Sequence, residues 1–165
     1  MHPPLSDWSN FFEGELAAAA ALAGLLFVSV SVNQARILQL GRMADRGLEG
    51  LVMLFLVLVV SSLPLIPGQP LRLLGAEIFL IAAMIFAILL PLQAAYLSLV
   101  EPPYRRASWK MVLLSRFTVG LIALSGLAVL VTASTAGFYL LCVGVLLTFF
   151  AVGANAWVLL IEINR

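Results

Sequence analysis

The sequence predicts an all-α fold, a polytopic bundle of transmembrane helices, from its composition and from the length of its apolar runs. Of the 165 residues, 63% are hydrophobic and 10% are charged, whereas roughly a quarter of the residues in soluble domains are charged. Apolar runs of about 20 residues, enough to cross a hydrocarbon core of about 30 Å, recur along the chain. Open strands leave backbone groups unpaired in lipid, and the alternating pattern of a barrel is absent, so each run should be a helix.

We therefore expect one transmembrane domain, 1–165, with five spans. The expected helices are 14–34, 48–66, 73–99, 111–132 and 138–161. The connections are short, because PLIPGQP at 64–70 and EPPYRRASWK at 101–110 contain prolines that break a helix, and ASTAG at 133–137 allows only a tight hairpin. No segment is long enough for a soluble domain, so we expect the protein to act within the bilayer or at its surfaces.

The distribution of Lys and Arg predicts how the chain is oriented in the membrane. Basic residues in short connections mark the cytoplasmic side. Seven basic residues lie on one side of the membrane in a topology with five spans: Arg36, Arg42, Arg46, Arg105, Arg106, Lys110 and Arg165. Only Arg72 falls in a connection of the opposite set. The pattern predicts an N-terminus outside, a C-terminus inside and, for a bacterial protein, a multi-pass protein of the inner membrane.

Aromatic residues give an independent prediction, because Trp and Tyr prefer the headgroup level, where their polar atoms stay wet. The aromatic residues expected at the outer interface are Trp8, Phe11, Phe12, Phe138 and Tyr139. Those expected at the inner interface are Tyr96, Tyr104, Trp109 and Trp157. The aromatic and basic residues thus predict the same orientation.

Arg116 stays charged at any biological pH, yet it lies inside the apolar run 111–132. Its side chain leans toward the helix N-terminus, which here points at the inner interface, so the guanidinium can snorkel out of the lipid. Alternatively, Arg116 faces the bundle and pairs with a carboxylate at the same depth. Glu49 and Glu162 are the candidate partners.

Other polar side chains fall in the same inner third of their helices. They are Ser29, Asn33, Gln34, Gln93, Asn155 and Glu162. Polar groups at this depth mark either a transport pathway or hydrogen bonds between helices. On the outer side, Glu77 can snorkel and meet Arg72, or it can join Glu13 and Glu15 in an acidic mouth that concentrates cations.

Small residues predict where helices approach closely. The expected packing residues are Ala17, Ala20, Ala21 and Gly24 in the first helix, with Gly120 and Gly126 in the fourth. Such a face would contact a helix of the same bundle or of a second chain, and the sequence leaves both open. Pro91 removes a backbone hydrogen bond inside the third helix and predicts a kink next to Gln93, for which gating is one role and bundle geometry another.

Three stretches resemble a family of small polytopic bacterial inner-membrane proteins of unsettled function. They are WSNFFEGELAAAAALAGLLFVSVSVNQARIL (8–38), RGLEGLVMLFLVLVVSSLPLIPGQ (46–69) and GANAWVLLIEI (153–163). Some members of that family carry an automatic label as modulators of the membrane AAA protease. The resemblance implies an inner-membrane location and supplies no catalytic or ligand residues.

The sequence argues against an enzyme. It has no Ser–His or Cys–His set, no metal cluster and no glycine-rich phosphate loop, and its single histidine is His2. We expect no metal, no cofactor and no nucleic acid partner. Two hypotheses remain: an ion or small-solute channel or transporter formed by self-association, and an accessory or regulatory subunit that packs on a larger membrane complex such as a membrane protease. The lipid bilayer is a partner in both.

Overall fold

The chain folds into a bundle of long helices in a computed structural model that describes residues 6–32 and 42–163. The short 3-10 helix η1 (Ser6–Trp8) leads into α1 (Ser9–Val32), and α3 (Arg42–Ser62) is followed by the 3-10 turn η2 (Leu63–Leu65). The chain then forms α4 (Leu71–Leu99), α5 (Pro102–Thr132) and α6 (Gly137–Ile163). The described residues contain five helices that are long and apolar enough to cross a membrane. The all-α fold predicted from the sequence is confirmed, and these spans fit a multi-pass membrane protein.

The basic segment 101–110 differs from the expectation, because it is helical rather than a turning connection. α5 begins at Pro102, with Glu101 in extended conformation just before it. Proline is well suited to the first turn of a helix, since its missing N–H would have no intrahelical partner there and its fixed φ suits the helix. Only Val100 and Glu101 separate α4 from α5, so the basic residues extend α5 beyond the apolar run.

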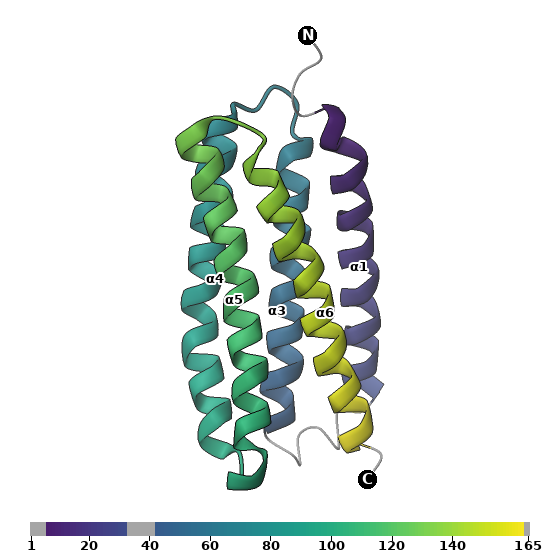
Figure 1. Ribbon diagram of the computed structural model, residues 1–165. Coiled ribbons are helices and arrows are strands. Elements are labelled where there is room, and N and C mark those ends of the chain that lie inside the picture. The colour runs from purple at the N-terminus through teal and green to yellow at the C-terminus, as the bar shows by residue number, and fades with distance from the viewer. Residues whose placement is uncertain (1–5, 33–41, 164–165) are drawn as a thin grey trace.

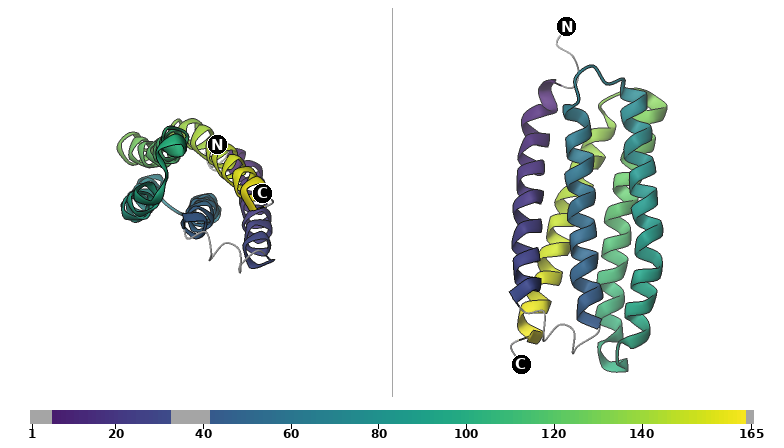
Figure 2. Two further views of the ribbon diagram at one scale, coloured as in Figure 1. Left: turned by 90° about the horizontal axis from the view of Figure 1, so that it is seen from below. Right: turned by 180° about the vertical axis from the view of Figure 1, so that it is seen from behind.

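α3 lies in the middle of the bundle and packs against α1, α4 and α6 (Figures 1 and 2). α4 pairs with α5 along its length, and α5 also packs on α6. α6 starts beside α5 and runs obliquely, so that its second half lies next to α1 in both side views.

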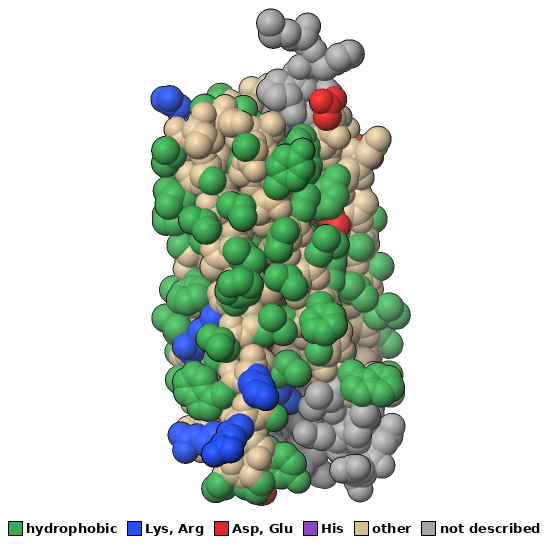
Figure 3. Space-filling model, in the orientation of Figure 1, with side chains coloured by type: hydrophobic (Ala, Val, Ile, Leu, Met, Phe, Trp, Pro, Cys, Tyr) green, Lys and Arg blue, Asp and Glu red, His purple; other side chains and the backbone are tan. Residues whose placement is uncertain are grey.

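The two ends of the bundle carry different side chains. The N-terminal end holds η1, η2 and the turn at 133–136, and the opposite end, here called the basic end, holds the start of α3 and the connection between α4 and α5. Figure 3 shows apolar side chains covering most of one face, with Lys and Arg side chains gathered toward its lower, basic end. This arrangement is what a helix bundle surrounded by lipid requires.

Glycines bring α4 and α5 into close contact. A Cβ atom added at Gly126 would lie 2.5 Å from the backbone nitrogen of Phe79 and 2.9 Å from the carbonyl oxygen of Gly75. These distances are shorter than van der Waals contact, so only glycine allows the two backbones to approach this closely. Gly120, in contrast, has no atom within 4 Å of an added Cβ and takes no part in the contact.

α1 is the least enclosed span. Only 11% of its apolar window is buried, compared with 50% of the window in α3. Its buried side chains are Phe12, Ala19, Ala23 and Leu26. The predicted small-residue face, Ala17, Ala20, Ala21 and Gly24, is exposed instead, and nothing lies within 4 Å of a Cβ added at Gly24. Among the described residues, that face is therefore turned outward rather than into the bundle.

Candidate functional site

A chain of hydrogen bonds crosses three helices in the half of the bundle nearer the basic end. The side-chain amide of Gln93 on α4 donates through Nε2 to Oε1 of Glu49 on α3, at 2.8 Å. Arg116 on α5 donates through Nε to Oε1 of Gln93, also at 2.8 Å. Glu49 and Gln93 are buried, with 4% and 0% of their surface exposed, and Arg116 is half-buried. The sequence pattern named all three residues as separate candidates.

Gln93 is the residue that joins the other two. A primary amide can donate through nitrogen and accept through oxygen, so one side chain connects a carboxylate to a guanidinium. Arg116 therefore bonds to a residue of the bundle, but its direct partner is the amide of Gln93 rather than a carboxylate. Gln93 in turn bonds to Glu49. Arg116 as a whole residue is half-buried, so part of it is also accessible from outside the bundle.

A second polar layer lies one helical turn nearer the basic end. The Arg46 guanidinium carbon sits 4.9 Å from the centre of the Tyr96 ring, a cation–π contact, and the hydroxyl groups of Tyr96 and Ser108 are 2.7 Å apart. Arg46 precedes Glu49 by three residues on α3, and Tyr96 follows Gln93 by three on α4, so the two layers stack on the same helix faces. We call Arg46, Glu49, Gln93, Tyr96, Ser108 and Arg116 the polar cluster.

The charges of the polar cluster do not cancel. It contains two guanidinium groups and one carboxylate, and Arg46 has only 8% of its surface exposed. In the described residues, Arg46 makes its contact with the face of Tyr96 and forms no ion pair with Glu49. A buried guanidinium is costly unless an anion or hydrogen-bond acceptors compensate it. The cluster is therefore suited to hold an anionic group.

The sequence predicts only the side of the membrane on which Arg46 and Tyr96 lie, and it gives no prediction for Ser108. The useful signal was the three-residue spacing that puts Arg46 with Glu49 and Gln93 with Tyr96. Ser108 belongs to the second polar layer because it lies on α5, eight residues before Arg116 and thus about two helical turns closer to the basic end. These residues form one group only when the register of α3, α4 and α5 is known.

The other predicted polar residues lie apart from the polar cluster or outside the described side chains. Asn155 on α6 is buried with 3% exposure, and its Oδ1 has no hydrogen-bond partner among the described residues. Pro91 lies on the exposed side of α4, which continues through it as one helix. The predictions for Asn33, Gln34 and the side chain of Glu162 lie outside the part of the chain that the structure describes.

At the N-terminal end, Glu77 accepts a hydrogen bond from Nε2 of Gln69, in the connection before α4. Arg72 is exposed, and the described residues show no ion pair between it and Glu77. Glu13 is exposed and Glu15 is half-buried on α1. The three carboxylates therefore lie on two helices, and Glu77 is already engaged by an amide.

Four other buried hydroxyl groups of the described bundle bond to their own helices, whereas the buried Ser61 hydroxyl has no hydrogen-bond partner among the described residues. Ser115, Thr118, Ser125 and Thr148 each donate to a backbone carbonyl three or four residues earlier. Such bonds satisfy the hydroxyl without linking two helices. The side-chain hydrogen bonds of the polar cluster, in contrast, link α3, α4 and α5. In the described residues, no group of three or more His, Cys, Asp or Glu side chains is arranged to hold a metal ion.

No family model, no curated protein and no solved structure matches this chain.

Proposed function

We propose that the chain is a non-enzymatic membrane protein that moves an ion or small polar solute across the bilayer as a self-associated assembly. The observation that carries this proposal is the polar cluster. A charged side chain inside a membrane helix costs roughly 2.5–3.5 kcal/mol at the helix centre on insertion scales, and such residues usually mark a pathway. The excess positive charge of the cluster favours an anionic solute.

The half-buried position of Arg116 supports a binding role. Its Nε is fixed by Gln93 at 2.8 Å, which orients the planar guanidinium while leaving its other nitrogens directed away from that bond. A guanidinium fixed in this way can bind a carboxylate, a phosphate or a smaller anion by two parallel hydrogen bonds. Glu49 balances one of the two positive charges. The cluster can therefore bind an anion weakly enough to release it.

Packing inside the chain supports transport by an assembly. Beyond the polar cluster, toward the N-terminal end, the core is filled by apolar side chains such as Ile78, Ile122 and Leu141, all with 0% exposure. A pathway between chains would avoid this packed layer. The exposed face of α1, Ala17, Ala20, Ala21 and Gly24, offers the close helix contact that self-association needs.

The orientation is part of the proposal. Arg46, Arg105, Arg106 and Lys110 all lie at the basic end, which the positive-inside rule assigns to the cytoplasm of a bacterial inner membrane. The polar cluster would then open toward the cytoplasm. A reporter enzyme active only in the cytoplasm, fused to the C-terminus, should be active. Activity only of a reporter that needs the outer compartment would contradict the orientation.

Flux through liposomes containing the purified protein tests the function. A panel of small anions and cations should include at least one anion that moves faster than in empty liposomes. Arg116→Gln should lower that flux by about 10-fold or more, because it removes the fixed guanidinium and each lost charged hydrogen bond costs roughly 1.5–3 kcal/mol. Arg106→Gln is the matched control, since Arg106 is exposed on the same helix. No flux of any ion, or equal loss in both variants, would contradict the proposal.

A second candidate function is an accessory subunit of a larger membrane complex, and the exposure of α1 favours it. A span with only 11% of its apolar window buried is available for a helix of a different protein as well as for a second copy. Gentle solubilisation and measurement of the particle mass separate the two. A mass equal to a small multiple of this chain supports self-association, and a stoichiometric second protein supports the accessory role.

A further inference from the structure

One face of α5 changes from charged to apolar along a straight stripe. Residues at intervals of four, three, four and seven positions lie on the same face of this helix: Arg106, Lys110, Leu113, Phe117 and Leu124. All of these side chains are exposed, and the accessible fractions of Leu113, Phe117 and Leu124 are 66%, 56% and 50%. We call these five residues the α5 stripe. Its charged part lies at the basic end, and its apolar part runs along the membrane span.

The charged part of the α5 stripe has no partner of opposite charge among the described residues. The segment from Pro102 to Lys110 contains Arg105, Arg106 and Lys110 and no Asp or Glu, and Glu101 stands just before it. All three cations are exposed, and none forms an ion pair with a described residue. Figure 3 shows Lys and Arg side chains gathered at this end of the molecular surface. Like charges within about two helical turns produce a positive local field, which attracts an anion.

Aromatic residues indicate the depth of these charges in a membrane. Tyr104 and Trp109 are 58% and 47% exposed, and Trp109 directly precedes Lys110. Exposed Trp and Tyr side chains prefer the headgroup level of a bilayer. We therefore expect Arg106 and Lys110 at the level of the phosphate groups, which their long and flexible stems can reach.

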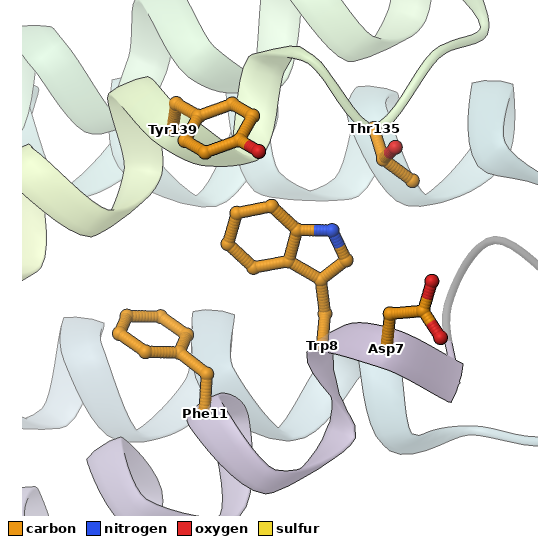
Figure 4. Close-up of a pocket in the computed structure, with 5 residues that line it drawn as sticks. All are labelled: Asp7, Trp8, Phe11, Thr135 and Tyr139. Carbon is orange, nitrogen blue, oxygen red and sulfur yellow. The ribbon is translucent and has the colours of Figure 1, made fainter.

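The opposite end of the bundle shows that aromatic residues alone do not create such a charge. Figure 4 shows a hollow there that is lined by Trp8, Phe11 and Tyr139 together with Asp7 and Thr135. None of these lining residues is Lys or Arg. The two ends therefore differ in charge rather than in aromatic content, and we expect a preference for anionic headgroups at the basic end.

The apolar part of the α5 stripe follows the path that a lipid molecule takes into the bilayer. Lys110 and Phe117 are about 10 Å apart along the helix axis, and Leu124 lies about 10 Å further. Between Phe117 and Leu124 the same face carries Gly120, where nothing lies within 4 Å of an added Cβ atom. A phospholipid presents its groups in the same order, with a phosphate at the headgroup level and an acyl chain below it.

We propose that the α5 stripe binds a phospholipid whose headgroup carries a net negative charge, with the phosphate between Arg106 and Lys110 and an acyl chain along Leu113, Phe117 and Leu124. Each Lys or Arg near an anionic membrane surface contributes about 1 kcal/mol, which corresponds to about 5-fold in affinity. The binding needs a bilayer and no flux, so it is independent of the transport proposal. Arg106→Gln remains a control for flux in liposomes of zwitterionic lipid, where the α5 stripe has no anionic headgroup to bind.

The test uses full-length protein in which Trp8→Phe and Trp157→Phe leave Trp109 as the sole tryptophan. The protein is placed in nanodiscs that contain equal amounts of phosphatidylglycerol, which is anionic, and phosphatidylcholine, which is zwitterionic. Bromine atoms on an acyl chain quench tryptophan fluorescence on contact, and each lipid carries them in turn. Brominated phosphatidylglycerol should quench Trp109 more strongly, with a relative affinity of about 10-fold or more in favour of the anionic lipid.

Two double variants separate charge from side-chain shape. Arg106→Gln together with Lys110→Gln should bring the affinities of the two lipids to within about 2-fold of each other, because both cations are lost. Arg106→Lys together with Lys110→Arg keeps both charges and should preserve the preference for the anionic lipid. Arg72→Gln is the matched control, since Arg72 is an exposed cation at the opposite end, and it should change the relative affinity less than about 2-fold. Helical circular dichroism checks that each variant is folded.

Native mass spectrometry gives a second measurement, on protein that keeps all its tryptophans. Protein released from the mixed nanodiscs should retain phosphatidylglycerol in preference to phosphatidylcholine, and the double replacement by Gln should abolish that preference. The proposal is overturned if both brominated lipids quench Trp109 equally, or if the preference survives the double replacement by Gln. A loss of the preference in the charge-conserving variant, or an equal loss in Arg72→Gln, would also overturn it.

Discussion

Two faces rich in small residues follow the same sequence pattern, but they have different surroundings. On α4 and α5, Gly75 and Gly126 lie at a backbone contact that excludes even a methyl group. On α1, the stripe that ends at Gly24 faces outward, and in the described part of the chain a Cβ added at Gly24 would have no atom within 4 Å. A small-residue face thus says that close approach is possible, and only the arrangement of neighbouring helices decides whether the partner belongs to the same chain.

The largest effect is expected from adding one methyl group at the α4–α5 contact. Gly126→Ala should lower the stability of the bundle by about 3 kcal/mol or more, because the new Cβ would lie 2.5 Å from the Phe79 backbone and the helices must separate. The midpoint of unfolding by denaturant in detergent measures the effect. Gly120→Ala is the control, and there Ala should be neutral or slightly stabilising, since nothing lies within 4 Å and Ala favours a helix.

The enclosed part of the bundle also contains the hydrogen bonds between helices, and Gln93→Leu tests how much they matter. The substitution leaves Glu49 buried without its donor and Arg116 without its acceptor, so we expect a loss of about 2–3 kcal/mol in the same unfolding assay. Ser115→Ala removes a buried hydroxyl that bonds only within its own helix and should cost less than about 1 kcal/mol. Equal losses would mean that the link between helices adds nothing.

The smallest change in folding stability is expected on α1. Gly24→Leu should alter the stability of the single chain by no more than about 0.5 kcal/mol, because the side chain enters open space. The same variant should weaken self-association by about 10-fold if this stripe is the contact between copies. Sedimentation in detergent over a range of protein concentrations measures the association, with Gly14→Leu, at another exposed glycine of α1, as the control. A loss of folding stability together with unchanged association would contradict the inference that this stripe faces another chain rather than its own bundle.

The sequence predicted the helices better than the contacts between them. Five apolar runs and their order follow from the length of lipid that a helix must cross, and this part of the fold agrees with the structure. The boundaries agreed less well, because prolines at 102 and 103 were interpreted as helix breakers although they stand where a helix can begin. The preference of a residue type indicates which conformations a segment can adopt. It does not indicate well where in a helix that residue lies.

For the polar cluster, the sequence singled out three of the six members and not the way in which they are connected. Arg116, Gln93 and Glu49 were each conspicuous, since polar groups in apolar runs need a reason. Their order, with the amide in the middle, depends on how far α3, α4 and α5 are shifted along one another, and no single helix contains that information. Arg46 was counted only as a cytoplasmic charge, and its contact with Tyr96 could not be seen without the distance between helices.

The very short link between α4 and α5 has a consequence for how the protein enters the membrane. During synthesis the chain emerges from its N-terminus, so Glu49 and Gln93 are made before Arg116, which follows Gln93 by only 23 residues. Two consecutive helices joined by Val100 and Glu101 can leave the insertion machinery together as a hairpin, with the guanidinium already bonded to the amide. Arg116 can then acquire its hydrogen-bond partner before α6 is synthesised.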